Sequence, residues 1–332
     1  MEYYGTLGPS CWETETLEKM IQAGMTGIRL NLSHRSLKES RQGVIHYQEA
    51  SKEQGKEPCL MIDLQGPELR IGNLPAEMIL EEGKEIILGD GQIQIPEIIL
   101  PFLNKGQRIL LDDGKIQLEV LDSIDETSVK CHVLCGGFLT SRKSIALPGC
   151  EINNPTLTKQ DMDNLFDARK FGVTDVMLPF VRGKEDLINL REALKQAGCP
   201  GVRIFAKIEN MQGVDHLDEL IPYSDYIVIA RGDLGNAMPL YKLPAIQYQI
   251  AEKCKVSGRK FMVVTQMLNS MIELPYPTRA EVNDIFQAVM QGASAVMLTG
   301  ETAAGKYPAE AMSMLVNTGR EAERIAKKMP HE

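Results

Sequence analysis

An alternation of strand-like and helix-like segments limits the folds open to this 332-residue chain more than any other feature. Eight short apolar or β-branched runs recur, and each is eventually followed by an amphipathic segment with helical spacing. The runs are residues 3–7, 27–30, 59–63, 175–178, 202–208, 225–230, 261–264 and 295–298. The helical segments are residues 15–23, 37–53, 159–171, 184–197, 214–221, 243–256, 280–290 and 308–326. This alternation predicts an α/β fold with a parallel sheet, and eight units predict a closed (β/α)8 TIM barrel.

An open, doubly wound sheet is the alternative for alternating β and α elements. That architecture usually carries a GxGxxG phosphate-binding loop after an early strand, and no such loop follows the first strands here. The closed barrel is therefore the favoured prediction.

One interval interrupts the alternation after the third strand. Strand-like pieces at residues 85–88, 93–95, 108–111, 116–120 and 128–134 are separated by glycine-containing turns, which is typical of a small all-β module. We therefore expect a barrel domain made of residues 1–70 and 150–332, with a β-barrel-like lid domain at residues 71–149. An insertion at this point lies on the carboxyl-end face, where barrel enzymes have their active sites.

Composition excludes several classes of partner. The chain has 36 basic and 45 acidic residues, a net charge of -9, so nothing favours binding to nucleic acid or to an anionic membrane. No run of about 18 apolar residues predicts a transmembrane helix, and the amino terminus does not resemble a signal peptide. Seven scattered cysteines without CxxC spacing fit a cytoplasmic protein.

Polar side chains follow the expected strands at the edge where a barrel places its site. Lys207 and Glu209 lie two residues apart at the end of the fifth strand, so both should face the same way. Asp233 follows the next strand, in the stretch IVIARGDLG, and its carboxylate is expected beside that of Glu209. Two carboxylates without His or Cys nearby favour Mg²⁺ or Mn²⁺ over zinc.

Cationic and backbone groups accompany these carboxylates. Lys207 and Arg29 supply positive charge for a substrate that carries phosphate and carboxylate groups. The glycines of RGDLG allow close approach of a ligand, and a helical turn that begins there would present N–H groups to an anion. We expect Arg231 to form a structural salt bridge.

Nine motifs carry a resemblance that extends from Gly5 to about Arg324. In chain order they are LGPSC, IRLNLSH, DLQGPELR, LDDG, KIEN, ARGDLG, TQMLNSM, PTRAE and LTGETAAGKYP. The chain resembles the pyruvate kinase family, for which the KIEN–ARGDLG and TQML–PTRAE pairs are highly specific. The resemblance implies phosphoryl transfer from phosphoenolpyruvate to ADP, giving pyruvate and ATP, the last step of glycolysis.

The resemblance also implies roles for individual residues. Lys207 looks like the cation that stabilises charge on the phosphoryl group and on the developing enolate. The catalytic set that it implies is Lys207, Arg29 and Thr265. The substrate-binding set is Lys207, Gly232, Asp233, Thr265 and Arg29. The nucleotide-binding set is His34, Arg70 and Asn31. The Mg²⁺ ligands are Glu209 and Asp233.

The family also commonly binds K⁺. The residues that match its ligands are Asn31, Ser33, Asp63 and Leu64. Leu64 stands where the family usually has Thr, so a backbone carbonyl would serve there. Glu68 matches the residue associated with K⁺ dependence, and we therefore expect this protein to need K⁺.

Several features depart from the family's pattern. Gln65 replaces the Lys of DTKGPE, Pro179 replaces the Ser of SF[IV]R, and Arg35 stands where Gly usually follows His34. We also expect the family's C-terminal domain, which carries the allosteric sugar-phosphate site and one subunit interface, to be missing. Activation by a sugar phosphate is therefore not expected, while a homodimer formed through the barrels stays open.

Two other functions stay open from the sequence. One is a binding or regulatory module of the same fold with weak or no turnover, which Gln65 and Pro179 favour. The other is a metal-dependent lyase or aldolase acting on pyruvate or oxaloacetate, because fold does not fix function. A Schiff base on Lys207 would mark that enzyme. The intact Lys207, Glu209 and Asp233 favour the kinase.

Overall fold

The chain divides into two compact units. A computed structural model describes residues 1–33, 35–90, 92–112, 114–150, 152 and 154–328. The first unit comprises Met1–Gly66 and Thr156–Glu332, and the second comprises Pro67–Pro155. These boundaries lie a few residues outside the expected ones at 70/71 and 149/150. The reason is that Arg70 pairs with Ser144 in an antiparallel bridge, so its segment belongs to the second unit.

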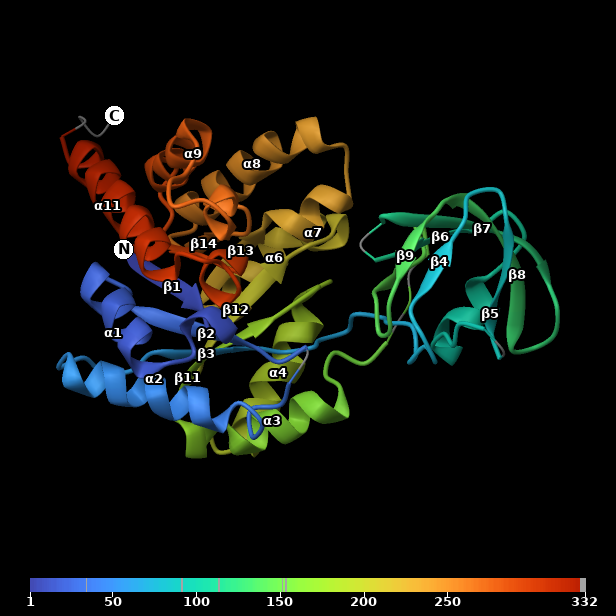
Figure 1. Cartoon of the computed structure of the whole chain (residues 1–332), viewed down its shortest axis with the longest axis horizontal. Coiled ribbons are helices and arrows are strands. Elements are labelled where there is room, and N and C mark those ends of the chain that lie inside the picture. Colours follow the sequence, from blue (N-terminus) through green and yellow to red (C-terminus); the bar gives the residue numbers. More distant parts are fainter. Residues whose placement is uncertain (34, 91, 113, 151, 153, 329–332) are drawn as a thin grey trace. The chain divides into compact units, whose positions relative to one another are not determined.

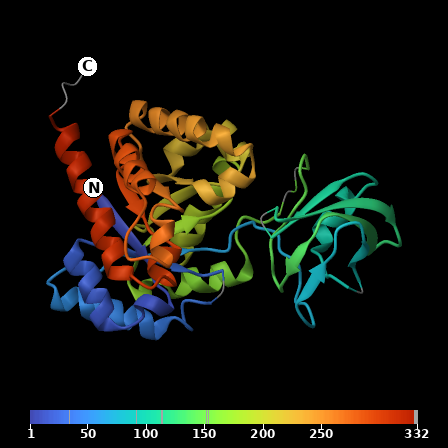
Figure 2. The same cartoon turned by 45° about the horizontal axis from the view of Figure 1, so that its top comes forward.

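The first unit is a closed barrel of parallel strands with helices around it (Figure 1, Figure 2). The strand order is β1-β15-β14-β13-β12-β11-β3-β2, so the predicted (β/α)8 barrel is confirmed. Its strands are β1 (Glu2–Thr6), β2 (Gly27–Asn31), β3 (Leu60–Asp63), β11 (Val173–Leu178), β12 (Arg203–Ile208), β13 (Tyr226–Ala230), β14 (Lys260–Val264) and β15 (Ala295–Met297).

The helices of the barrel unit follow the predicted segments closely. They are α1 (Thr14–Ala23), α2 (Arg41–Glu53), α3 (Lys159–Phe171), α4 (Lys184–Gln196), α5 (Met211–Asp215), α6 (Leu217–Leu220), α7 (Arg231–Asn236), α8 (Leu243–Val256), α9 (Arg279–Met290), α10 (Gly300–Ala303) and α11 (Pro308–Ala326). The single helix expected at 214–221 is wrong. His216 leaves helical geometry between α5 and α6, and a 3₁₀ turn with Pro222 follows.

The interior of the barrel is filled by alternate residues of its strands. Because successive side chains of a strand point to opposite faces, one series from each strand points inward. The buried inward cluster is Tyr4, Met61, Met177, Phe205, Tyr226, Val228, Ala230, Met262, Val264, Ala295 and Met297. The same series continue beyond this apolar plug, and they bring polar side chains to both ends of the barrel.

The second unit is built from antiparallel strands around its own apolar core. Its five-stranded sheet has the order β10 (Ile145–Ala146), β6 (Arg108–Leu111), β7 (Ile116–Ser123), β8 (Ser128–Cys135), β5 (Glu85–Gly89). A second sheet pairs β4 (Met78–Leu80) with β9 (Gly137–Leu139). The described residues thus form two sheets, where we expected a single barrel-like module. The strand expected at 93–95 is reduced to a bridge between Leu88 and Ile93.

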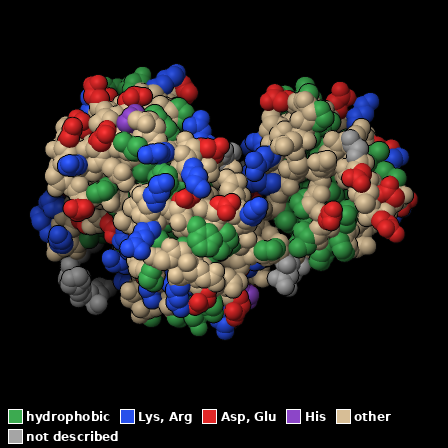
Figure 3. Space-filling model, turned by 90° about the horizontal axis from the view of Figure 1, so that it is seen from below, with side chains coloured by type: hydrophobic (Ala, Val, Ile, Leu, Met, Phe, Trp, Pro, Cys, Tyr) green, Lys and Arg blue, Asp and Glu red, His purple; other side chains and the backbone are tan. Residues whose placement is uncertain are grey.

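Two observations concern the helices and one face of the barrel unit. No helix in the described part of the chain combines the length and apolar character needed to cross a bilayer. On the face of the barrel unit that Figure 3 shows, basic and acidic side chains are interspersed.

A charged network closes the amino end of the barrel. Arg203 donates from Nε to Asp175 Oδ1 at 2.6 Å and from Nη1 to Glu2 Oε1 at 3.1 Å. Tyr226 donates its hydroxyl to Glu2 Oε1 at 2.7 Å, and Tyr4 donates to Asp175 Oδ2 at 3.0 Å. Asp175 is fully buried, and these donors satisfy both oxygens of its side chain.

Replacing Arg203 by Met should therefore destabilise the barrel, because the carboxylate of Asp175 would lose its cation. We expect a loss of roughly 3 kcal/mol in the free energy of unfolding, measured by urea titration. Lys195, paired with Glu192 on the surface, is the matched control, and Lys195→Met should change stability by less than about 0.5 kcal/mol. Equal effects of the two substitutions would contradict the assigned role of Arg203.

Candidate active site

Inward-facing side chains converge at the carboxyl end of the barrel. The inward series of β12 passes from Phe205 to Lys207 and then to Glu209, just beyond the strand. Asp63 continues the inward series of β3 after Met61. Lys207 Nζ lies 2.9 Å from Glu209 Oε1 and 3.3 Å from Asp63 Oδ2. The expectation that Lys207 and Glu209 face the same way is confirmed.

One carboxylate oxygen of Asp63 contacts two cationic side chains. Arg29 donates to Oδ2 from Nη2 at 2.6 Å and from Nε at 2.9 Å, and Lys207 approaches the same oxygen. The other oxygen, Oδ1, is buried and has no hydrogen-bond partner among the described residues. An unpaired buried carboxylate oxygen is costly, and a bound cation would satisfy it. Asp63 therefore fits the K⁺-ligand role that the resemblance implies.

Lys207 is held in its charged form. Burial by itself would lower the pKa of Lys207, but the negative charges of Asp63 and Glu209 outweigh it and hold that pKa well above its ordinary value. The side chain is therefore an ammonium ion at neutral pH. An ammonium ion stabilises a neighbouring anion, whereas Schiff-base chemistry requires the free amine.

The pKa of Glu209 is also raised above its ordinary value. Burial raises the pKa of Glu209 to about 7; the charge of Lys207 opposes this rise, and those of Asp233 and Asp63 add to it. A divalent cation between Glu209 and Asp233 would remove their repulsion. Phe180 N donates to Glu209 Oε2 at 2.8 Å and so fixes the orientation of the carboxylate.

The donor set fits Mg²⁺ better than a metal that takes all its ligands from protein. Within the described ranges, no group of three or more His, Cys, Asp and Glu side chains is arranged to hold a metal. Mg²⁺ is usually held by one or two carboxylates, with water and substrate oxygens completing its shell. Glu209 and Asp233 match this pattern.

The segment after β13 begins helix α7 at once, as expected for RGDLG. Thr265, in the loop after β14, accepts a hydrogen bond on Oγ1 from Gly232 N at 2.8 Å. Its hydroxyl donates to Val264 O at 2.5 Å. The Gly232 N–H, which we expected to face an anion, therefore already donates a hydrogen bond to Thr265. A ligand carboxylate at this place would have to replace Thr265 as the acceptor.

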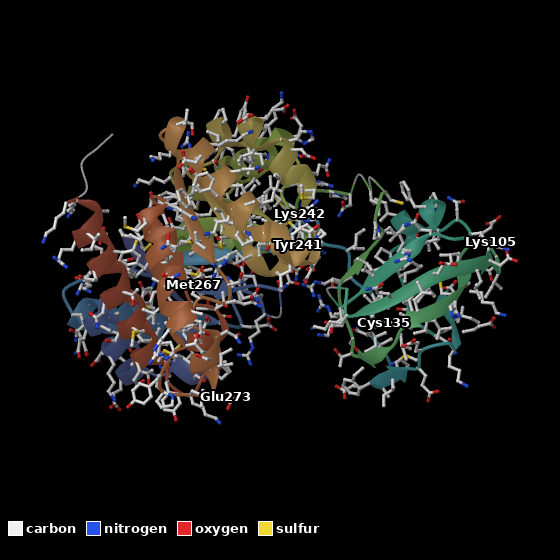
Figure 4. The ribbon with its side chains drawn as sticks, turned by 90° about the horizontal axis from the view of Figure 1, so that it is seen from above. Lys105, Cys135, Tyr241, Lys242, Met267 and Glu273 are labelled. Atoms are coloured by element: carbon white, nitrogen blue, oxygen red, sulfur yellow. The ribbon has the colours of Figure 1, made fainter. Side chains whose placement is uncertain are left out.

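Arg231 is a structural residue. Its Nη1 lies 2.6 Å from Asp284 Oδ2 of α9, and its Nη2 donates to Thr265 O at 2.8 Å and to Met267 Sδ at 3.0 Å. Met267, labelled in Figure 4, is fully buried. The cation after β13 thus ties α7 to the neighbouring loop and helix. This arrangement confirms the expected salt bridge of Arg231.

The loop after β2 lies beside Asp63. In the strand register Asn31 is the partner of Asp63, and Leu32 N donates to Asp63 O at 2.9 Å. Ser33 N donates to Asn31 Oδ1 at 3.1 Å, which fixes the turn. His34, expected near the nucleotide, lies outside the described residues. Leu64 continues from β3, where its N–H donates to Met177 O at 3.1 Å.

Two further expected site residues belong to the second unit. Arg70 forms an ion pair with Glu68 and donates from Nη1 to Arg142 O at 2.9 Å. Both side chains are thus held within that unit. Their roles toward nucleotide and K⁺ stay predictions.

Comparison with known proteins decides the family of the chain. The family model described as the barrel domain of pyruvate kinase matches residues 2–312. This chain belongs to the pyruvate kinase family. The pyruvate kinase of Staphylococcus haemolyticus is 37% identical over 329 residues, which cover 96% of this chain and 56% of that protein. The chain therefore spans little more than half the length of that relative.

Two further members support this membership. The pyruvate kinase of Thermotoga maritima is 37% identical over 328 residues, 96% of this chain and 70% of that protein. A crystal structure of a pyruvate kinase from Cryptosporidium parvum matches with a TM-score of 0.87 at 32% identity. It covers 97% of this chain and 69% of that one.

The departures from the pyruvate kinase pattern have local explanations in the structure. Gln65 uses both ends of its amide: Nε2 donates to Gln160 Oε1 at 3.0 Å, and Oε1 accepts from Thr158 Oγ1 at 3.2 Å. It is thus bound to the start of α3. Pro179 packs against Gly66, where a Cβ atom would lie 2.7 Å from Pro179 Cγ. Arg35 lies 5.8 Å from the ring centre of Trp12, a cation–π contact.

Some groups at this end of the barrel escaped the sequence analysis. The backbone N–H of Phe180 orients Glu209, and the hydroxyl of Thr6 accepts from Arg29 Nη1 at 3.4 Å. Neither contact leaves a pattern in the sequence, because each joins residues from separate strands. Asp161 holds the loop after Asp63, and its only readable signal is the helix-capping pattern that it forms with Thr158.

Proposed function

We propose that this chain catalyses phosphoryl transfer from phosphoenolpyruvate to ADP, giving pyruvate and ATP. The observation that carries the proposal is the buried cluster of Lys207, Arg29, Asp63 and Glu209 at the carboxyl end of a pyruvate kinase barrel. Phosphoryl transfer asks little covalent chemistry of a protein and depends on positioning and charge. A charged lysine between the carboxylates of Asp63 and Glu209 supplies both.

Lys207 and Arg29 stabilise the negative charge of the reaction in this proposal. Both are anchored on Asp63 Oδ2, which fixes their positions before substrate arrives. Arg29 contacts the phosphoryl group, and Lys207 lies between that group and the enolate oxygen that develops as the bond breaks. Such preorganised charges are among the strongest contributions to catalysis.

Glu209 and Asp233 would hold Mg²⁺ or Mn²⁺, which, when bound, neutralises charge on the phosphoryl and carboxylate oxygens. Gly232, Asp233 and Thr265 receive the substrate carboxylate. Binding there exchanges the hydrogen bond between Gly232 and Thr265 for bonds to the ligand. Lysine chemistry of the lyase type is not favoured, since the pKa of Lys207 is raised above its ordinary value.

The remaining expected roles complete the proposal. Asn31, His34 and Arg70 take part in nucleotide binding. K⁺ binds through Asn31, Ser33, Asp63 and the carbonyl of Leu64. In this proposal the reaction takes place in the cytoplasm. Its ligands are phosphoenolpyruvate, pyruvate, ADP and ATP, and neither nucleic acid nor a membrane takes part. A homodimer through the barrels is compatible with this site.

ATP formation from phosphoenolpyruvate and ADP, with Mg²⁺ and K⁺, tests the proposal. We expect sustained turnover with kcat in the range of about 1–1,000 s⁻¹, which is usual for enzymes. Binding of phosphoenolpyruvate without turnover would instead indicate a non-catalytic module. Borohydride trapping of pyruvate on Lys207 would indicate the lyase.

Replacing K⁺ by tetramethylammonium at constant ionic strength should lower the rate. The buried Oδ1 of Asp63 would then lack a cation, and the site for the substrate phosphate would be less well ordered. We expect kcat/KM to fall by about tenfold or more, measured as initial rates over a range of substrate concentrations. Equal rates in the two salts would show that K⁺ has no role.

A further inference from the structure

The buried carboxylate of Asp161 holds the loop that follows β3. Oδ1 accepts a hydrogen bond from Gln65 N at 2.7 Å, and Oδ2 accepts one from Gly66 N at 3.1 Å. The side chain is 0% exposed. Burial raises the pKa of Asp161, and the backbone donors oppose that rise. The proposed reaction makes no use of this carboxylate, so its contacts require another explanation.

The same carboxylate also holds the segment that returns from the second unit. Thr158 N donates to Asp161 Oδ2 at 2.9 Å, and Thr158 Oγ1 accepts from Asp161 N at 3.0 Å, which forms a capping box at the start of α3. Thr158 in turn donates to the side chain of Gln65. One acidic side chain therefore binds the chain where it leaves the barrel unit and where it re-enters.

The hydrogen bond from Gln65 N sets the direction of the Leu64 carbonyl. Leu64 O and Gln65 N belong to one planar peptide group, and no cis peptide bond occurs among the described residues. In a trans peptide the C=O points opposite to the N–H. Since the N–H points to Asp161, the Leu64 carbonyl points away from α3. Leu64 N is bound to Met177 O at 3.1 Å, so the residue is fixed on both sides.

We propose that Asp161 is a positioning residue for the monovalent-cation site. It fixes the Leu64–Gln65 peptide so that the Leu64 carbonyl joins the oxygens of Asp63 and the loop after β2 around one cation. The inference rests on the proposed function for the identity of that cation. Leu64 has no side-chain oxygen, so the carbonyl, and with it the peptide orientation, supplies the fourth ligand.

Helix α9 shows that the cap and the loop contact are separable. Its capping box pairs Thr278 with Glu281, and the longer Glu281 side chain reaches back to Thr278 N at 2.8 Å. Glu therefore serves as a capping residue at this helix position. Asp161→Glu should keep α3 capped, because Glu is common at this position. The added methylene, however, moves the carboxylate away from Gln65 and Gly66.

The experiment compares the wild-type chain with Asp161→Asn and Asp161→Glu. Asp163→Asn, an exposed carboxylate of the same helix, is the matched control. Hydrogen exchange is followed in peptides that cover residues 61–66, without substrate. Thermal unfolding is followed in KCl titrations, with tetramethylammonium chloride keeping the ionic strength constant, because a cation that binds the native state raises its stability.

In both Asp161 variants, the amide hydrogens of residues 65 and 66 should exchange with solvent at least about tenfold faster than in the wild type. Both should need at least about fivefold more K⁺ for half-maximal stabilisation, while Asp163→Asn behaves as the wild type. If Asp161→Asn does not fold, Asp161→Glu, which keeps the capping box, carries the test.

Wild-type exchange and wild-type K⁺ dependence in Asp161→Glu would overturn the proposal and reduce Asp161 to a helix cap. Absence of K⁺-specific stabilisation in the wild type would overturn it as well. Failure of the proposed function looks different, since K⁺ would stabilise the wild type without any formation of ATP.

Discussion

Replacing Lys207 by Met should lower kcat/KM for phosphoenolpyruvate by about three orders of magnitude, or roughly 4 kcal/mol of transition-state stabilisation. The ammonium group lies 2.9 Å from Glu209 and 3.3 Å from Asp63, and these carboxylates keep it charged. Met has a similar length without the charge. Because charge on the phosphoryl group and enolate develops during the reaction, kcat should fall more than KM rises.

Lys260→Met is the matched control for this loss. Lys260 also belongs to a barrel strand, but it lies at the amino end of β14, 5.4 Å from the ring centre of Tyr226. Its substitution should leave kcat/KM within about a factor of two of the wild-type value. Initial-rate kinetics over a range of phosphoenolpyruvate concentrations measure both variants. A Lys207→Met variant within tenfold of the wild type would refute the role given to this lysine.

The second large effect is expected from Asp63→Ala. This change leaves Arg29 and Lys207, whose side chains are only 12% and 13% exposed, without their shared carboxylate. Breaking a buried ion pair by removing one partner costs about 3–5 kcal/mol, so we expect a loss of that order in unfolding free energy. The two cations would also lose their fixed positions, and turnover should become undetectable.

Glu273→Gln provides the contrast on the surface. Glu273, labelled in Figure 4, pairs with Lys306, and both side chains are well exposed, at 67% and 63%. Exposed pairs contribute little, so its unfolding free energy should change by less than about 0.5 kcal/mol. Urea titrations of the variants measure both effects. If Asp63→Ala were as stable as Glu273→Gln, the buried cluster would not have the energetic role described here.

The barrel was predictable because long elements carry a periodic signal. The segments at 159–171, 243–256 and 308–326 were predicted with the bounds that α3, α8 and α11 have in the structure. The predicted barrel strands end within one residue of the observed ones. The short strands β4, β9 and β10, of three, three and two residues, were missed because a period of two is not visible over so few positions.

The part of the site that was predictable from the sequence is the part that a single strand carries. Lys207 and Glu209 share a face because they lie two residues apart on β12 and just beyond it. The sharing of Asp63 Oδ2 by Arg29 and Lys207 depends on how three separate strands lie in the barrel. The hydrogen bonds from Gly232 N to Thr265 Oγ1 and from Gln65 N to Asp161 Oδ1 likewise join distant segments. Such contacts follow from the fold, and no spacing pattern in the sequence indicates them.

Transfer of the phosphoryl group itself tests the central claim most directly. The wild-type protein, in excess over phosphoenolpyruvate labelled with ³²P in its phosphoryl group, is mixed with ADP, Mg²⁺ and K⁺, and the products are separated after one turnover. The label is expected in ATP, with an equal amount of pyruvate formed. Label that stays in phosphoenolpyruvate, or that appears in inorganic phosphate, would contradict the account.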